Sequence, residues 1–435
     1  MSRSFPLVFV SLSAAVLSAA SGPRESIDPA FQRIPFDQWL GEHGQAPFRW
    51  TVAVPHGELS FHQRLMARLD VKVDGRGLES RRGDGELVFF YQIKDRDGTR
   101  YQDHTAIQLS KLDENIKAAD LEVTQRAFLV PGDYRLAVGV LDTATGEHSA
   151  SQSQFRIASP HNFLPDAWHD LAPVEFIGNQ EPPDGWFLPG IHGRLQWAAS
   201  VHSPARINVV LNVAPSVPVP GSRRTQSGSL AALLPTLKVI SQTGSPALSE
   251  HVELLDLARR RAAFQQDQVH DLDWPRLKAS LEEASTASID VHSLTERHHD
   301  AQFFVSRVRS LLRASEKQPC VLLVLTNPVA FESGENLEPV STEALPACGV
   351  FYIRYHEPVP RVSPFDQQMG GRGWGSRRGG GPIRNRPPQE VVDQLEATLK
   401  PLGPRVFDVA TPEEMTKALG EIEKSLLAMD GQSSR

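Results

Sequence analysis

The stretch Val209-Val-Leu-Asn-Val-Ala-Pro-Ser216 decides the fold that the sequence predicts for the C-terminal half of the chain. It begins as an apolar run and ends in small and polar residues, and Leu323-Val-Leu-Thr-Asn-Pro328 repeats that pattern further along. A strand that is apolar on both faces is buried on both faces, which is typical of a central parallel strand. Ligands of such sheets bind beyond the carboxyl ends of the strands, where the polar residues of both stretches lie.

Other segments alternate between strand and helix patterns around these two runs. Val252–Leu257 is typical of a further strand, and Arg261–Gln266 is a candidate hairpin partner for it. Apolar residues at helical spacing, such as Phe304, Val308 and Leu311, predict helices between the strands. We therefore expect residues 193–428 to form a doubly wound, Rossmann-like α/β domain with a mostly parallel sheet.

The N-terminal half has a different pattern. Residues 48–158 contain short runs rich in β-branched and aromatic residues, such as Leu87–Ile93 and Tyr134–Leu141, separated by turn pairs such as Asp97-Gly98. Strands at this spacing predict an all-β sandwich. The stretch from Pro131 to Asp142 resembles a late strand of the immunoglobulin-like domains in bacterial surface proteins.

The remaining segments are predicted to be connectors or to be removed. Residues 1–20 combine Arg3, an apolar run and the small residues Ser18-Ala-Ala20, which is the pattern of a cleaved signal peptide. We expect an N-terminal extension over 21–47, a linker over 159–192 and a disordered tail over 429–435. The chain is therefore expected to be exported, to the periplasm or beyond the cell, and to have no membrane-spanning segment.

Composition and cysteine usage narrow the chemistry. The chain has 435 residues, 40% of them apolar, and a formal net charge of −7, which gives no global reason to expect nucleic acid as a partner. Cys320 and Cys348 each precede a predicted strand. If those strands are parallel neighbours, both sulfurs lie at the same edge of the sheet, and an exported chain would allow a disulfide there; two buried thiols are the alternative.

Strand order and the two polar strand ends resemble the von Willebrand factor A family. That family places Asp-x-Ser-x-Ser after its first strand and a Thr-Asp pair after its fourth, where these groups hold a divalent cation. The resemblance places Asn212, Ala214, Ser216, Thr326 and Asn327 at those positions of this chain. It rests on the order of the strands rather than on intact motifs.

This sequence departs from the family pattern at the charged positions. Asn212 and Asn327 stand where the resemblance implies aspartates, and Ala214 stands where it implies a serine. A hard cation relies on anionic oxygen ligands, so we expect neither a functional metal site nor another cofactor. The resemblance then implies a degenerate site whose residues hydrogen-bond the ends of the strands.

A second feature is the Arg/Gly-rich loop, residues 361–388. It contains six arginines and one acid, with Trp374 among the glycines. The residues that could contact a polyanion are Arg372, Trp374, Arg377, Arg378, Arg384 and Arg386. An unstructured insertion is the alternative.

No nucleophile elbow, phosphate-binding loop or zinc-protease motif occurs in the sequence, so we expect a protein that is not an enzyme. The hypothesis is a binding or scaffold protein that recognises another exported or envelope protein without metal. The alternatives are a polyanion-binding module acting through the Arg/Gly-rich loop, and an exported hydrolase with an unrecognised site. Export argues against nucleic acid as the polyanion.

Overall fold

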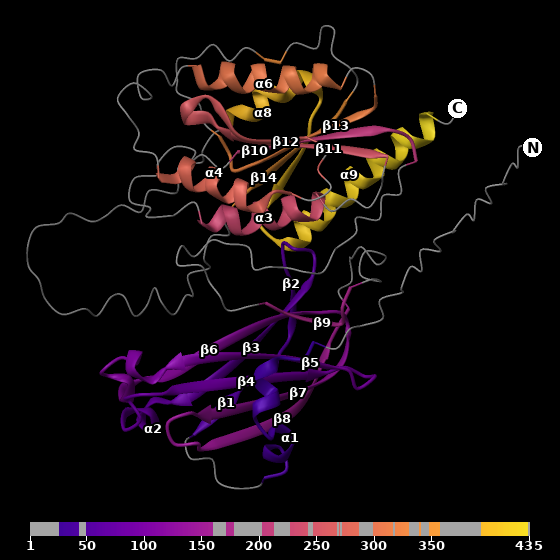
Figure 1. Cartoon of the computed structure of the whole chain (residues 1–435). Coiled ribbons are helices and arrows are strands. Elements are labelled where there is room, and N and C mark those ends of the chain that lie inside the picture. The colour runs from indigo at the N-terminus through magenta and orange to yellow at the C-terminus, as the bar shows by residue number, and fades with distance from the viewer. Residues whose placement is uncertain are drawn as a thin grey trace, which may run out of the picture.

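In the computed structural model, most of the described residues lie in three β-sheets and the helices that cover one of them (Figure 1). Strands outweigh helices among the residues it describes, so the described chain is mostly β. The structure describes residues 26–42, 49–159, 171–177, 202–212, 227–241, 247–267, 269, 272–286, 299–315, 318–329, 339–340, 348–356 and 393–433.

The N-terminal half consists of two antiparallel sheets whose inner faces share one apolar core. The first sheet has the order β1-β3-β6-β9, with β2 paired to β3; the second has the order β5-β4-β7-β8. Alternation of buried and less buried residues along β3 and β6 lets one face of each strand pack inward. The strands are β1 (Trp50–Val52), β2 (Gly57–Leu59), β3 (Leu65–Asp74), β4 (Glu86–Lys94), β5 (Arg100–Gln108), β6 (Asp120–Leu129), β7 (Gly132–Asp142), β8 (His148–Ile157) and β9 (Val174–Ile177).

The predicted boundaries of this half need one correction. β9 lies within residues 159–192, which the sequence predicts to be a linker, and it pairs antiparallel with β6. Only four residues long, β9 is too short to stand out in a segment rich in proline and glycine. The shorter helices here are α2 (Gly75–Glu79), η2 (Leu109–Lys111) and η3 (Ile116–Ala118).

The N-terminal extension packs onto the outer face of the second sheet. It forms η1 (Pro29–Arg33) and α1 (Phe36–Trp39), whose aromatic residues bury against Phe90. Gly139 permits this approach, since a Cβ there would lie 2.6 Å from the ring of Phe36. The extension therefore supplies a small second core for the N-terminal half.

The C-terminal half is a six-stranded sheet with the order β12-β11-β10-β13-β14-β15. Helices cover both faces (Figure 1): α3, α4 and α9 lie on one side, and α6 and α8 on the other. The strands are β10 (Ala205–Asn212), β11 (Leu248–Asp256), β12 (Arg261–Asp267), β13 (Cys320–Thr326), β14 (Cys348–Tyr355) and β15 (Arg405–Val409). The helices are α3 (Ser227–Ile240), α4 (Trp274–Thr286), α6 (Asp300–Ala314), α8 (Gln394–Leu399), η7 (Lys400–Leu402) and α9 (Pro412–Ser433).

The predicted fold class is wrong. The C-terminal sheet is mixed, because β12 runs antiparallel to β11 while the other neighbours in the sheet are parallel. The connection between β11 and β12 is only η5 (Leu257–Arg259) and Arg260, whose φ of 50° reverses the chain. A parallel connection needs a dozen residues or more. Together with two antiparallel sheets, this makes a mostly β chain rather than one with a doubly wound parallel domain.

Two smaller expectations concern the ends of this half. The predicted hairpin partner at 261–266 is confirmed as β12. The predicted disordered tail is wrong for residues 429–433, because α9 continues to Ser433. Its apolar face, which includes Leu419, Ile422 and Leu426, is fully buried and holds the helix on the sheet.

Cys320 and Cys348 are register partners on the parallel strands β13 and β14. Their Cα atoms lie 4.7 Å apart and a disulfide joins them. That separation falls within the range that disulfides span without moving the backbone. Among the residues that the structure describes, no helix is long and apolar enough to cross a membrane.

Candidate functional site

The carboxyl ends of the central strands bring together three of the positions that the family resemblance singled out. Asn212 ends β10 and Thr326 ends β13, and the two are register partners. Asn212 Nδ2 donates to Thr326 Oγ1 at 3.0 Å, and Thr326 Oγ1 donates to the Asn327 carbonyl at 2.9 Å. Both side chains are buried, so this hydrogen bond links the ends of β10 and β13 away from solvent.

These side chains are neutral and engaged with each other. The Asn212 amide supplies a proton to Thr326, and the Thr326 hydroxyl supplies its own to a carbonyl. Asn327 Oδ1 is a buried oxygen that accepts no hydrogen bond from any residue that the structure describes. One unused amide oxygen is a weak basis for a hard cation, which prefers several anionic oxygens. Ala214 and Ser216 lie outside the described residues.

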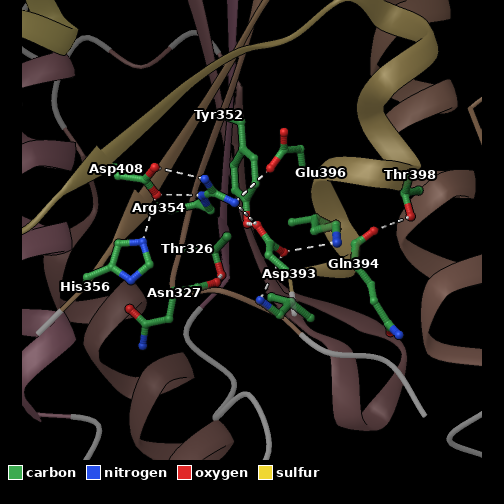
Figure 2. Close-up of polar contacts among 12 residues, drawn as sticks. Thr326, Asn327, Tyr352, Arg354, His356, Asp393, Gln394, Glu396, Thr398 and Asp408 are labelled. Carbon is green, nitrogen blue, oxygen red and sulfur yellow. Dashed lines mark hydrogen bonds and ion pairs between the residues drawn. The ribbon is translucent and has the colours of Figure 1, made fainter. Parts of the chain in front are cut away.

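Next to this pair lies a charged cluster centred on Arg354 of β14 (Figure 2). Its guanidinium makes two parallel hydrogen bonds to Asp408 of β15, Nε to Oδ1 at 2.8 Å and Nη2 to Oδ2 at 2.9 Å. Nη1 donates to Asp393 Oδ2 at 3.0 Å and to Glu396 Oε2 at 2.8 Å. His356 Nε2 lies 2.8 Å from Asp408 Oδ1. We call Arg354, His356, Asp393, Glu396 and Asp408 the Arg354 cluster.

Asp393 connects the cluster to the rest of the sheet edge. It caps α8 by accepting from the Leu395 amide at 3.1 Å, and it also accepts from the Val329 amide at 3.3 Å and the Tyr352 hydroxyl at 2.9 Å. A carboxylate at a helix start is stabilised by the unpaired amides there. Asp393 thus joins the turn after β13, strand β14 and helix α8 in one network.

Exposure divides the Arg354 cluster into a buried base and an open surface. The side chains of Asp393 and Arg354 are 6% and 16% exposed. The side chains of Glu396, Asp408 and His356 are 48%, 60% and 46% exposed. One arginine against three carboxylates leaves a formal charge of −2. The surface is therefore acidic, and its carboxylates on Glu396 and Asp408 are hydrogen-bonded to Arg354 beneath them.

Electrostatics in the Arg354 cluster follow from these contacts. Partial burial works against ionisation of Asp408, but hydrogen bonds from Arg354 and His356 outweigh it and lower the pKa of Asp408. Burial, and then the negative charge of Asp393, raise the pKa of the Tyr352 hydroxyl well above its usual range. Tyr352 thus stays neutral and donates to Asp393. Asp408 therefore stays charged at neutral pH.

The sequence did not single out the Arg354 cluster. Arg354 lies 39 residues from Asp393 and 54 from Asp408, so no local spacing connects them. The available signals were a polar residue near the end of each predicted strand and an aspartate before a helix. Neither becomes a site until the parallel register pairs Arg354 with Asp408.

The other candidates lie elsewhere. The Arg/Gly-rich loop, with its polyanion contacts Arg372, Trp374, Arg377, Arg378, Arg384 and Arg386, falls outside the described residues. One group with metal-ligand chemistry does lie among the described residues, at the edge of β5: ligand atoms of Asp28, Asp103 and His104 lie within 4.8 Å of one another. His104 Nδ1 already contacts Asp28, and Asp103 accepts from Gln125 Nε2 at 2.7 Å, so hydrogen bonds within the protein account for this arrangement.

Comparisons with known proteins add no family. No family model and no curated protein matches this chain. A solved structure described as an ApaA protein from Bordetella pertussis is 16% identical, covering 27% of this chain and 99% of that one, with a TM-score of 0.18. A glycosyl hydrolase family 2 member from Bacteroides cellulosilyticus is 8% identical, covering 71% of this chain and 42% of that one, with a TM-score of 0.19. Neither similarity carries an argument about fold or function, and the von Willebrand resemblance stays a prediction.

Proposed function

We propose that this chain is an exported, non-catalytic binding protein that recognises a basic segment of another exported or envelope protein. The Arg354 cluster is the recognition surface. The observation that supports this is the combination of exposed carboxylates on Glu396 and Asp408 with a partly buried arginine that hydrogen-bonds both of them. A preorganised acidic surface favours association with lysine and arginine side chains because little conformational freedom is lost on binding.

The chemistry of the neighbouring residues also favours binding without metal. Asn212 and Thr326 hydrogen-bond each other at the strand ends, and neither carries a charge. Lysine and arginine side chains of the partner would supply the positive charge that a divalent cation supplies in the von Willebrand factor A family. Polyanion binding is less consistent with this surface, since its charge is negative. It stays a prediction for the Arg/Gly-rich loop, as hydrolysis does for an unrecognised site.

The proposal is tested with a fluorescein-labelled nonalysine peptide titrated into the full mature chain and followed by anisotropy. Glu396→Lys reverses an exposed charge in the Arg354 cluster, and Glu122→Lys is its matched control, because Glu122 is also exposed but lies on β6 of the N-terminal half. We expect Glu396→Lys to weaken binding at least fivefold and Glu122→Lys to change it less than twofold. EDTA should leave the affinity unchanged.

Three results would contradict the proposal. Equal weakening by both variants would mean that only the net charge matters. Loss of binding in EDTA would mean that a metal is required. Tighter binding of heparin than of the peptide, abolished by deleting residues 370–388, would support the polyanion alternative instead.

A further inference from the structure

A hairpin of the N-terminal half reaches the sheet edge that carries the Arg354 cluster. The hairpin is formed by β2 and β3, and its tip is Ser60–Arg64. In Figure 1 it rises from the N-terminal sheets to the start of α9. Gln63 at the tip is 3% exposed, an unusual burial for a polar turn residue. The tip is therefore an internal contact between the two halves and not a solvent-exposed turn.

The hydrogen bonds of Gln63 explain its burial. Thr416 Oγ1 donates to Gln63 Oε1 at 2.6 Å, and Gln63 Nε2 donates to the Pro412 carbonyl at 3.4 Å. Both partners lie in the first turns of α9. The amide therefore satisfies a helix hydroxyl and a helix carbonyl at once, from about 350 residues away in sequence. A buried amide with both ends paired fixes relative position as well as contact.

The backbone of Gln63 is strained at the position from which its side chain contacts α9. Its φ of 55° lies in the left-handed region, where a residue with a side chain is strained and glycine is not. The tip is closed by the Gln63 amide donating to the Ser60 carbonyl at 2.8 Å. Glycine would satisfy this turn without strain. Glycine would, however, lack the side-chain amide that hydrogen-bonds α9.

A second contact reaches the other strand of the cluster. The ring of Phe61 packs edge-on against Tyr355, with ring centres 5.7 Å apart. Tyr355 lies between Arg354 and His356, while Pro412 follows Asp408 by four residues. The His356 amide then donates to the Val409 carbonyl at 2.8 Å, which joins the two strand ends. The hairpin thus contacts β14 at Tyr355 and the chain after β15 at Pro412 and Thr416.

We infer that the β2–β3 hairpin is a clasp through which the N-terminal half holds the Arg354 cluster in its binding geometry, with Gln63 and Phe61 as positioning residues. The first part, the clasp itself, stands on the contacts alone. The second part, its effect on recognition, rests on the proposed function. The N-terminal half would thereby take part in recognition without touching the partner.

The clasp is tested on the full chain by hydrogen–deuterium exchange. Gln63→Gly removes the side chain and relieves the left-handed backbone, so a residue needed only for the turn would tolerate it. Thr416→Val removes the hydroxyl that donates to Gln63. The matched control is Thr398→Val in α8, because Thr398 is also buried, at 1% exposed against 8% for Thr416, and donates to the Gln394 carbonyl but does not contact the hairpin.

We expect Gln63→Gly and Thr416→Val to speed exchange at least tenfold in residues 405–416 and at His356, with β4 unchanged. Thr398→Val should leave both regions at the wild-type rate. Wild-type rates in the first two variants, with circular dichroism showing a folded chain, would overturn the clasp.

Binding of the nonalysine peptide separates this inference from the proposed function. Gln63→Gly should weaken the peptide at least threefold. Faster exchange with unchanged peptide affinity would overturn the effect on recognition while keeping the clasp. Absence of peptide binding by the wild type would count against the proposed function, and the exchange result would still decide the clasp.

Discussion

Arg354 and Asp408 are register partners on the parallel strands β14 and β15, and two hydrogen bonds of 2.8 and 2.9 Å join them side by side. The paired geometry matches the planar fork of the guanidinium to the two carboxylate oxygens. Asp393 and Glu396 also accept hydrogen bonds from this guanidinium, so Arg354 pairs with three carboxylates, one from β15 and two from the start of α8. Arg354 therefore connects β14 to β15 and to the start of α8.

Removing Arg354 is expected to destabilise the chain. Arg354→Ala leaves Asp393 buried beside Tyr352 without its cation, and breaking a buried pair from one side costs several kcal/mol. After allowance for partial exposure, we expect the free energy of unfolding to fall by about 2–3 kcal/mol. Urea denaturation measures this. Arg68→Ala, which breaks the exposed pair with Asp70, should cost less than about 1 kcal/mol; similar losses in both variants would contradict the role of the cluster.

Removing the disulfide is expected to destabilise the oxidised chain. The bond links residues 28 apart, and the loop-entropy relation assigns such a loop about 3.6 kcal/mol. Cys320→Ala/Cys348→Ala should lose about this much, and reductant should lower the stability of the wild type but not of the variant. The measurement is urea denaturation with and without reductant. Two thiols that titrate in the unreduced, denatured wild type would show that the bond is absent.

Mild acid is expected to destabilise the chain through His62, at the hairpin tip. Burial, and then the positive charges of Lys238 and Arg64, lower the pKa of His62 from 6.5 to about 3. As the pH falls, His62 is therefore protonated in the unfolded chain before it is protonated in the folded chain. The neutral, buried His62 costs no stability above pH 6.5, and the free energy of unfolding decreases as the pH falls from 6.5 toward 3.

We expect His62→Phe, which keeps the ring packing against Phe128, to remove about 2 kcal/mol of this acid sensitivity. Chemical denaturation at pH 7.5, 6, 5 and 4 measures the slope. The control is His56→Gln at an exposed position, which should keep the wild-type slope. An unchanged slope in His62→Phe would place the acid sensitivity elsewhere.

Asp103 is expected to act in the opposite direction. Burial raises its pKa from 3.8 to about 6, although a hydrogen bond from the His104 amide works against this. The folded chain then holds a proton that the unfolded chain has released, so stability falls as pH rises from about 4 to 6 and is level above that. Asp103→Asn keeps an acceptor oxygen for Gln125 and should raise the free energy of unfolding at pH 7 by about 1 kcal/mol. Denaturation at pH 4 and pH 7 checks this, since the gain should vanish at pH 4; a loss at pH 7 would show that the carboxylate is needed.

Part of the fold could be predicted because burial leaves a local trace in the sequence. The apolar runs that begin at Ile207 and at Cys320 do form the central strands β10 and β13, and Arg261–Gln266 does pair with the strand before it. The prediction named the hairpin at 261–266 but did not draw its consequence. A strand that returns through a tight hairpin runs antiparallel to its neighbour, so the sheet is mixed. β9 was missed because four residues leave little pattern.

The candidate site could be predicted only in part. Asn212, Thr326 and Asn327 were placed together at the strand ends, since carboxyl ends of neighbouring parallel strands meet at one edge. The charged residues that surround Arg354 carry no such signal, because their partners lie tens of residues away and depend on the register of β14 with β15.

The amino-acid pattern alone was enough to locate the longer buried strands and helices, because periodic burial is a property of neighbouring residues. It also placed the neutral amides at strand ends, whereas the pairing of the two cysteine-bearing strands was only a condition there and is shown by the structure. Only the tertiary structure decided that Arg354 collects three carboxylates, and that Gln63 contacts α9 from the other half of the chain. Such contacts depend on how whole elements pack, and packing sums interactions over the full chain that no local pattern records.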